Sequence, residues 1–146
     1  MRYRIAAAVA ASALILPVVS VEATAASPVR FNWVQYDSPG SDTGSNKSLN
    51  AEWVRVKNFG SKARTLTGWT IRDPQGHVFR FPTFKLGAGK TVRVHTGKGT
   101  NSRTDLYWRK TWYVWNNTGD KAILKNKGGT VVDTCKWSDG DGDTAC

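Results

Sequence analysis

The sequence contains few of the residues from which metal centres, disulfide frameworks and carboxylate-based active sites are built. Its 146 residues include two cysteines and two histidines, too few for a disulfide scaffold or a four-thiolate zinc site. Glu52 is the only glutamate after residue 25, which argues against most schemes with paired catalytic carboxylates. A Gly-x-Ser-x-Gly nucleophile motif is also missing. These absences predict no catalytic residues and no cofactor.

Long apolar runs are scarce, and the one clear example lies near the N-terminus. Ile5–Val19 is almost entirely apolar, follows two arginines and precedes the small residues Ala23-Thr24-Ala25. This run of about 15 residues is shorter than the roughly 20 that a membrane-spanning helix needs. The pattern indicates a secretory signal peptide over residues 1–25 that is cleaved before Ala26. We therefore expect residues 26–146 to form a single secreted domain that does not insert into the membrane.

Acidic residues are also scarce compared with basic ones. The chain has 21 Lys and Arg against 11 Asp and Glu, a net charge of +10. Without Arg2, Arg4 and Glu22 of the expected signal peptide, the net charge is +9. Such a charge favours anionic partners such as nucleic acid or acidic wall polymers. The other interpretation is that the charge serves solubility alone.

Helical periodicity is missing after the expected signal peptide, and alternation with a period of two takes its place. In Ala51–Asn58, the residues Glu52, Val54 and Val56 alternate with Trp53, Arg55 and Lys57. This predicts a strand with one buried and one exposed face. A buried Glu52 would need a basic partner.

Six further segments carry strand patterns between turn-forming residues. They are Val29–Tyr36, Leu66–Arg72, His77–Phe81, Thr91–His95, Lys121–Lys125 and Thr130–Trp137. A polar loop is expected over Asp37–Asn50, and no helix after the signal peptide. About seven short strands predict an all-β fold, an antiparallel sandwich of two sheets.

Four strings in order along the chain resemble the lamin-tail domain family. They are Asn50–Gly60 (NAEWVRVKNFG), Leu66–Asp73 (LTGWTIRD), Phe79–Pro82 (FRFP) and Val114–Asp120 (VWNNTGD). The resemblance runs from about Val29 to Trp137. It implies an immunoglobulin-like β-sandwich and a binding role without catalysis. Bacterial domains of this type are exported, alone or fused to enzymes, and here no coiled-coil rod or fused enzyme is seen.

Several residues of these strings have structural roles in our interpretation. Trp69 is expected in the core, and Asp73 before Pro74 in a turn. The string around Trp115 suits a tight turn in which Asn117 or Gly119 takes a positive φ and a side chain bonds to nearby backbone amides. The residues assigned structural roles are Trp53, Trp69, Trp115, Asn116, Asn117, Gly119 and Asp120. Of Trp108, Trp112 and Trp115, at least two are expected in the core.

The C-terminal residues 135–146 are predicted to form a disulfide loop. Cys135 and Cys146 enclose about 12 residues, so a bond between them would pin the tail more than the core. Within this loop, Asp139, Asp141 and Asp143 have the spacing of the first calcium ligands. The chain ends before the bidentate glutamate of such a site. Weak calcium coordination therefore stays open, and no other metal site is predicted.

Outward-facing cations, some interleaved with aromatic residues, are the candidate ligand-binding residues. They are Arg55, Lys57, Arg72, Arg93, Lys98, Arg103, Arg109 and Lys110. Cations beside aromatic rings suit single-stranded nucleic acid, and tryptophan faces also suit sugars.

These features leave three hypotheses. The first is an extracellular module that binds nucleic acid or another polyanion. The second is a surface module that adheres to wall glycan, or to a protein through an exposed sheet edge. The third is a small secreted hydrolase, for which only His77, His95 and scattered aspartates are available.

Overall fold

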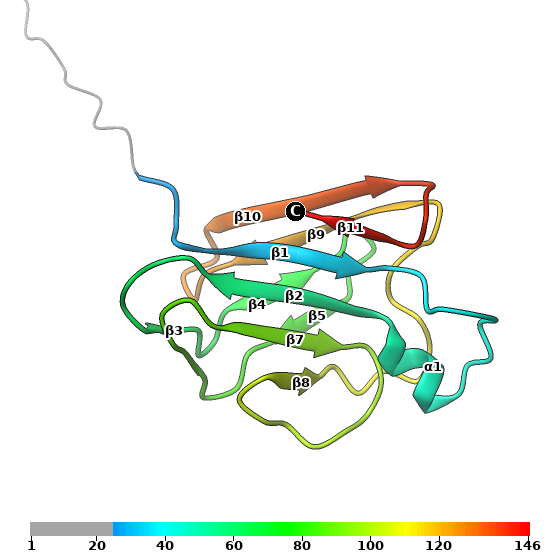
Figure 1. The fold of residues 1–146 in the computed structure, drawn as a ribbon. Helices are drawn as coiled ribbons and strands as arrows, with labels where there is room; N and C mark the ends of the chain where they lie inside the picture. Colours follow the sequence, from blue (N-terminus) through cyan, green and yellow to red (C-terminus); the bar gives the residue numbers. More distant parts are fainter. Residues whose placement is uncertain (1–24) are drawn as a thin grey trace, which may run out of the picture.

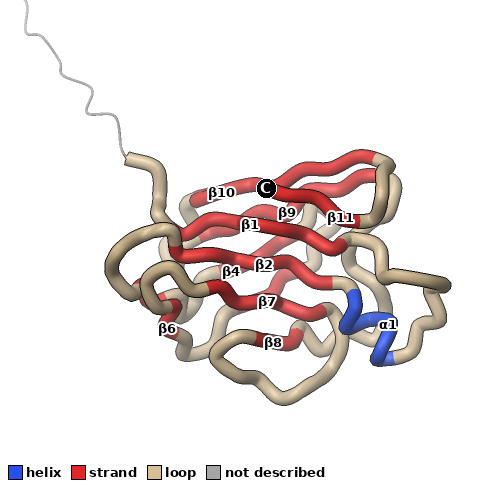
Figure 2. The backbone as a smooth tube through the Cα atoms, in the orientation of Figure 1, coloured by secondary structure: helices blue, strands red, loops and turns tan. Residues whose placement is uncertain are grey.

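The computed structural model describes residues 25–146, which fold into two β-sheets packed face to face (Figure 1). Apart from Ala25, the expected signal peptide lies outside the described residues. One sheet has the strand order β11-β1-β2-β7-β8 and the other β10-β9-β4-β5. A two-stranded sheet, β3-β6, lies at the end opposite helix α1 (Figure 2). The immunoglobulin-like β-sandwich predicted from the sequence is confirmed.

The elements have the following bounds. They are β1 (Val29–Gln35), α1 (Asn46–Ala51), β2 (Trp53–Asn58), β3 (Arg64–Thr65), β4 (Thr70–Arg72), β5 (Val78–Arg80), β6 (Lys85–Leu86), β7 (Thr91–His95), β8 (Asp105–Tyr107), β9 (Gly119–Lys125), β10 (Val131–Ser138) and β11 (Asp143–Ala145).

All seven predicted strands are present, as β1, β2, β4, β5, β7, β9 and β10. Strands β3, β6, β8 and β11 went unpredicted because two or three residues are too few to show an alternating pattern.

The expectation of no helix was wrong at α1, inside the predicted loop. This helix has six residues and one buried side chain, Leu49, and so no periodicity to detect; its N-cap Ser45 accepts the Ser48 N–H. No helix of residues 25–146 could span a membrane.

Strand pairing is antiparallel throughout the described sheets, except between β7 and β8. These two run parallel, with Val94 opposite Leu106, because residues 96–104 carry the chain back to the start of β7 before β8 begins. The predicted antiparallel sandwich therefore needs this one correction. Because of the parallel pairing, the chain enters β8 from the side where β7 begins and leaves it toward the α1 end.

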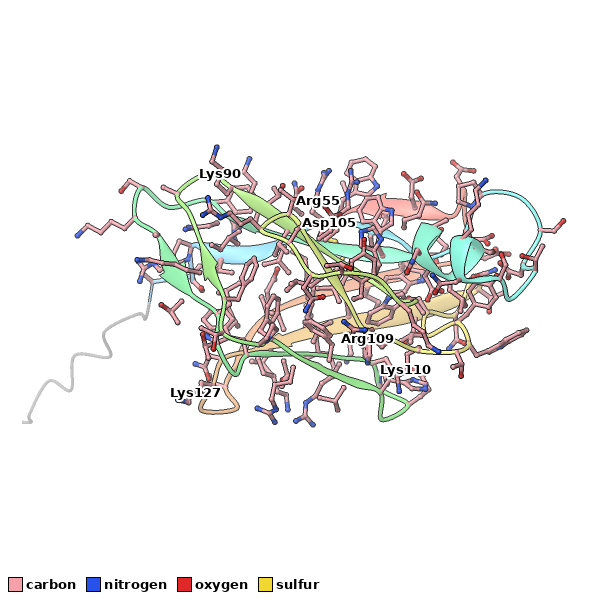
Figure 3. All side chains as sticks on the ribbon, turned by 90° about the horizontal axis from the view of Figure 1, so that it is seen from below. Arg55, Lys90, Asp105, Arg109, Lys110 and Lys127 are labelled. Carbon is pink, nitrogen blue, oxygen red and sulfur yellow. A yellow bond between two sulfur atoms is a disulfide. The ribbon has the colours of Figure 1, made fainter. Side chains whose placement is uncertain are left out.

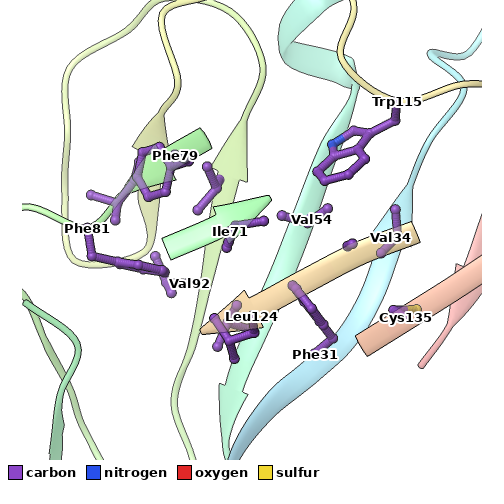
Figure 4. Packing of buried hydrophobic residues seen from close by; sticks show 14 of the residues in the cluster. Phe31, Val34, Val54, Ile71, Phe79, Phe81, Val92, Trp115, Leu124 and Cys135 are labelled. Atoms are coloured by element: carbon purple, nitrogen blue, oxygen red, sulfur yellow. The ribbon is translucent and has the colours of Figure 1, made fainter. Parts of the chain in front are cut away.

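The core forms where the inward faces of the two sheets meet. Val54 and Val56 of β2 are fully buried, and they face Ile71 of β4 and Leu124 of β9 within one cluster (Figure 4). Trp115 is buried and Trp108 packs against the cluster, whereas Trp112 is 65% exposed. The expectation that at least two of these three tryptophans belong to the core is confirmed, and Trp69 also packs against it.

The two predicted turns use aspartates as backbone acceptors. Asp73 Oδ1 accepts the His77 N–H at 2.7 Å, which closes the turn between β4 and β5. Asp120 accepts the N–H groups of Asn116 (3.1 Å) and Lys121 (2.8 Å), and Gly119 has a φ of 148°. The structural interpretation of both turns is confirmed.

The predicted Cys135–Cys146 disulfide is present, with a Cα–Cα distance of 5.5 Å. It does more than pin a loose tail. Cys135 lies on β10 of one sheet, while Cys146 directly follows β11, which pairs with β1 of the other sheet. The bond therefore joins the two sheets along one edge of the sandwich.

Glu52 is fully buried, but the expected basic partner is absent. The carboxylate accepts hydrogen bonds from the Thr96 hydroxyl (2.5 Å) and from the N–H groups of Val114 (2.9 Å) and Trp115 (3.3 Å). Burial raises the pKa of Glu52 from 4.5 to about 7, although these three hydrogen bonds act to lower it. A basic partner is not needed below about pH 7, because burial keeps the Glu52 side chain in its neutral, protonated form there.

Reduction of the disulfide should loosen β11 and leave the rest of the sandwich folded. In the chain-entropy model, a disulfide that closes a loop of about 12 residues stabilises the fold by roughly 3 kcal/mol. The thermal midpoint should therefore fall when the bond is reduced. Hydrogen exchange of the reduced protein is expected to accelerate at Thr144 and Cys146, whose N–H groups face β1, and to stay slow in β2 and β7. Exchange that accelerates equally in all strands would contradict this assignment.

The buried Glu52 makes stability depend on pH. Its pKa in the folded state, about 7, is raised above 4.5, so its contribution is fully present below pH 4.5 and is lost as the pH rises through 7. We expect the free energy of unfolding of the wild type, relative to Glu52→Gln, to decrease by about 3 kcal/mol between pH 4.5 and 8. Chemical denaturation of both proteins at the two pH values measures this, and an unchanged difference would contradict it.

Candidate anion-binding surface

The basic side chains of the described residues are not neutralised by carboxylates. Leaving out Arg2 and Arg4, 19 of the 21 Lys and Arg residues lie in residues 25–146. None of them forms a salt bridge within 4.0 Å, and both ion pairs of this region use histidine. Several carboxylates are engaged by other donors: Asp133 accepts the Phe31 N–H and Asp143 the Trp33 indole N–H. The cations therefore stay available for an external anion.

The eight predicted ligand-binding residues lie on separate surfaces. Arg55, Lys57 and Arg93 share the outer face of the five-stranded sheet, and Arg103 precedes β8 at its edge. Lys98, Arg109 and Lys110 lie in the segments that follow β7 and β8 at the α1 end. Arg72 is on β4 of the other sheet. The single basic face predicted from the sequence therefore corresponds to three separate surfaces in the structure.

On the outer face of the five-stranded sheet, aromatic rings hold the cations in place. Arg55 and Arg93 are opposite each other in the β2–β7 register, and their guanidinium carbons lie 5.8 and 4.7 Å from the Trp53 ring centroid. The Phe59 ring packs in the same way against two cations, with Arg30 Cζ 4.5 Å and Lys57 Nζ 4.9 Å from its centroid. Arg55 donates its Nε–H to Asn32 Oδ1 at 2.6 Å, so its terminal NH₂ groups are the donors that remain for an oxyanion.

Three adjoining hollows form a groove at the edge of this sheet, called the β7–β8 groove below. The first is lined by Arg55 and Arg93 and shares Thr91 and Thr104 with the second. The third shares Lys85 and Arg103 with the second. The cations of the β7–β8 groove are Arg55, Lys85, Lys90, Arg93 and Arg103. Figure 3 shows Lys90 toward one end, and Arg55 beside Asp105.

Sequence reasoning found three of these five cations and missed Lys85 and Lys90. Lys85 belongs to the two-residue strand β6, and Lys90 directly precedes β7. No alternation identifies either residue as outward. The Gly87-Ala88-Gly89 turn between them was the available signal, since it brings both lysines toward the start of β7.

The charges in the groove act on one another. Burial, followed by the neighbouring charge of Arg93, lowers the pKa of Arg55. Burial alone would raise the pKa of Asp105, but hydrogen bonds from His95 and Thr104 and the charges of His95 and Arg93 hold it below its usual range. Asp105, the one carboxylate lining these hollows, is thus already engaged. An incoming anion would relieve the repulsion between the two arginines.

Each histidine has an aspartate partner, a pairing that the sequence analysis missed. His95 Nε2 lies 2.8 Å from Asp105 Oδ1 and its Nδ1 2.7 Å from the Asn50 carbonyl oxygen, so both ring nitrogens are occupied. His77 Nδ1 lies 2.5 Å from Asp73 Oδ2, whose other oxygen closes the β4–β5 turn. These contacts give both pairs a structural role.

The aspartates proposed for weak calcium binding do not form a ligand cluster. Within residues 25–146, no three His, Cys, Asp or Glu side chains are placed to hold a metal ion together. Asp143 accepts the Trp33 indole N–H at 2.9 Å, while Asp139 and Asp141 are exposed. The calcium hypothesis therefore has no geometric support in this loop.

Comparison with known proteins identifies the family of this chain. The family model of the lamin tail domain matches residues 22–139, whereas no curated protein matches the chain. The matched range contains every strand of the sandwich except β11. Lamin tail domains are non-catalytic immunoglobulin-like domains, which agrees with the fold described above. The chain therefore belongs to the lamin tail domain family.

Proposed function

We propose that this protein is a non-enzymatic module that works outside the cell and binds linear polyanions, such as nucleic acid or acidic wall polymers, in the β7–β8 groove. The observation that carries the proposal is that none of the 19 Lys and Arg of residues 25–146 is paired with a carboxylate. Binding an anion there breaks no ion pair, so the Coulombic gain and the release of counterions are not offset by a lost internal contact.

The β7–β8 groove is favoured over the other basic surfaces because its cations are concentrated and ordered. Five of them line adjoining hollows, and Arg93 and Arg55 are held against Trp53. Oriented guanidiniums bind phosphate, sulfate and carboxylate groups with two N–H donors at a time. On the four-stranded sheet, Lys121, Lys125 and Lys136 lie on the strands without comparable stacking.

An extracellular location is supported by two features of the chain. The Cys135–Cys146 bond joins the two sheets, and such bonds persist in oxidising compartments. The N-terminal pattern of two arginines, an apolar run and Ala23-Thr24-Ala25 is that of a secretory signal peptide. Together they support a secreted protein whose anionic partners are outside the cell.

Removing three groove cations should weaken binding far more than removing three cations elsewhere. We expect Lys85→Ala/Lys90→Ala/Arg103→Ala to lose at least tenfold in affinity for heparin and DNA at 150 mM salt, and to flatten the dependence of log affinity on log salt. The matched control, Lys121→Ala/Lys125→Ala/Lys136→Ala, loses the same charge on the other sheet and should change affinity less than threefold. Fluorescence anisotropy across a salt series measures both.

Two outcomes would count against the proposal. Equal losses in the two triple variants would mean that net charge, and not the groove, attracts the ligand. Retention on isolated cell wall that survives high salt, without binding to DNA or heparin, would favour an adhesion module.

A further inference from the structure

Trp112 is exposed without a packing reason. Its side chain is 65% accessible, more than any other exposed large hydrophobic residue of the described chain, namely Phe59 (45%), Val78 (38%) and Val131 (52%). The neighbouring tryptophans Trp108 and Trp115 pack in or against the core. An indole left in water three residues before a buried one calls for an explanation, because burying it would be favourable.

The Trp112 ring is nevertheless held in a fixed place. It lies so close to Gly44 that a Cβ built there would be 2.7 Å from ring carbon Cζ3, and Gly44 has a φ of +68°. Tyr113 meets the ring edge-on, with centroids 5.4 Å apart and planes at 71°. The Tyr113 hydroxyl in turn bonds to Ser48 Oγ at 2.5 Å and accepts the Gly44 N–H at 3.2 Å. The ring is therefore oriented but not covered.

Three cations that take part in no ion pair accompany this ring. Arg109 and Lys110 precede it in the chain, and their N–H groups donate to the carbonyls of Gly97 (3.0 Å) and Thr96 (2.9 Å). These bonds hold the backbone before Lys98 beside that of Arg109 and Lys110, and the Lys98 N–H donates to Asn46 Oδ1 at 2.7 Å. Figure 3 shows Arg109 and Lys110 well away from Lys90, so this cluster is separate from the far end of the β7–β8 groove.

The backbone of this segment is strained at one of the cations. Arg109 has a φ of 65°, the only positive φ at a non-glycine residue among the described residues. Residues with a Cβ disfavour this conformation, and such strain concentrates where a side chain must be displayed for binding. The strain therefore agrees with a binding role for the segment.

We propose that Trp112, with Lys98, Arg109 and Lys110, is a stacking site for an unpaired base of single-stranded nucleic acid, whose phosphates the three cations bind. Any base can stack on an indole face, and cations beside the ring meet the strand's backbone. The inference rests on the proposed polyanion binding and adds a preference for single strands, since the bases of a duplex are already stacked on each other.

Other ligand classes fit these residues less well. A membrane surface would need several apolar side chains beside Trp112, but the other exposed large hydrophobic residues belong to other elements: Phe59 follows β2, Val78 begins β5 and Val131 begins β10. A neutral sugar would stack on the ring but would gain nothing from three cations. The combination of one flat ring and clustered positive charge favours a nucleic acid strand.

The test compares Trp112→Ala, Trp112→Phe and the control Val131→Ala, an exposed large hydrophobic residue elsewhere on the surface. Each binds a 20-nucleotide oligo-dT, a duplex of equal length and heparin. We expect Trp112→Ala to lose roughly tenfold in affinity for oligo-dT, as for one lost base stack, with Trp112→Phe intermediate. Affinity for heparin and duplex should change less than twofold, and Val131→Ala should behave as the wild type. Equal thermal midpoints establish that the variants are folded.

The possible results separate this inference from the proposed function. If Trp112→Ala binds oligo-dT as the wild type does, while the groove triple variant still weakens heparin binding, the stacking site is wrong and the polyanion-binding function stands. If Trp112→Ala instead loses binding to phosphatidylglycerol vesicles, the ring contacts lipid and the inference is overturned. If the wild type binds no polyanion, both fail together.

Discussion

The buried carboxylate of Glu52 connects the parts of the structure on which both proposed sites depend. It precedes β2, and its hydrogen bonds reach Thr96 at the end of β7 and the backbone of Val114 and Trp115. These contacts fix where the chain returns to the core after β8, with Trp115 buried against Trp137, which in turn stacks on Tyr36. The segment before Trp115 is thereby held at the α1 end, where Trp112 is exposed. The cost of placing the acidic group here is its burial, which raises the pKa of Glu52 to about 7 although the three donors act to lower it.

The fold also separates the two signs of charge. Asp73, Asp120 and Asp133 accept backbone N–H groups, and Asp143 accepts an indole N–H. Carboxylates used in this way stabilise turns and strand ends and leave few acidic groups for the lysines and arginines. A surface salt bridge would contribute about 0–1 kcal/mol, so the stability forgone is small. The result is a surface of unpaired cations, which concentrates a multivalent anion far more than a surface of ion pairs would.

The sequence was sufficient to predict the strands that show an alternating pattern. It was insufficient to predict contacts between residues that depend on the register of paired strands. The alternation in β2 correctly assigned Val54 and Val56 to the core and Arg55 to the outer face. It could not place Arg55 opposite Arg93, because that contact depends on the β2–β7 register. The partners of Glu52 were predicted wrongly because two of its donors are backbone groups 62 and 63 residues away. Backbone donors are the same for every residue type, so no side-chain pattern reveals them.

Strand β8 relates the β7–β8 groove to Trp112. Because β7 and β8 are parallel, the residues before β8, Arg103 and Thr104, line the groove, and the residues after it lead to Arg109 and Trp112 at the other end. Three residues of strand span about 10 Å, so a ligand must extend at least this far to contact both regions. Two contacts on one chain raise the effective concentration of the second contact. If both regions bind as proposed, a polyanion long enough to reach from one to the other should bind more tightly than a short one.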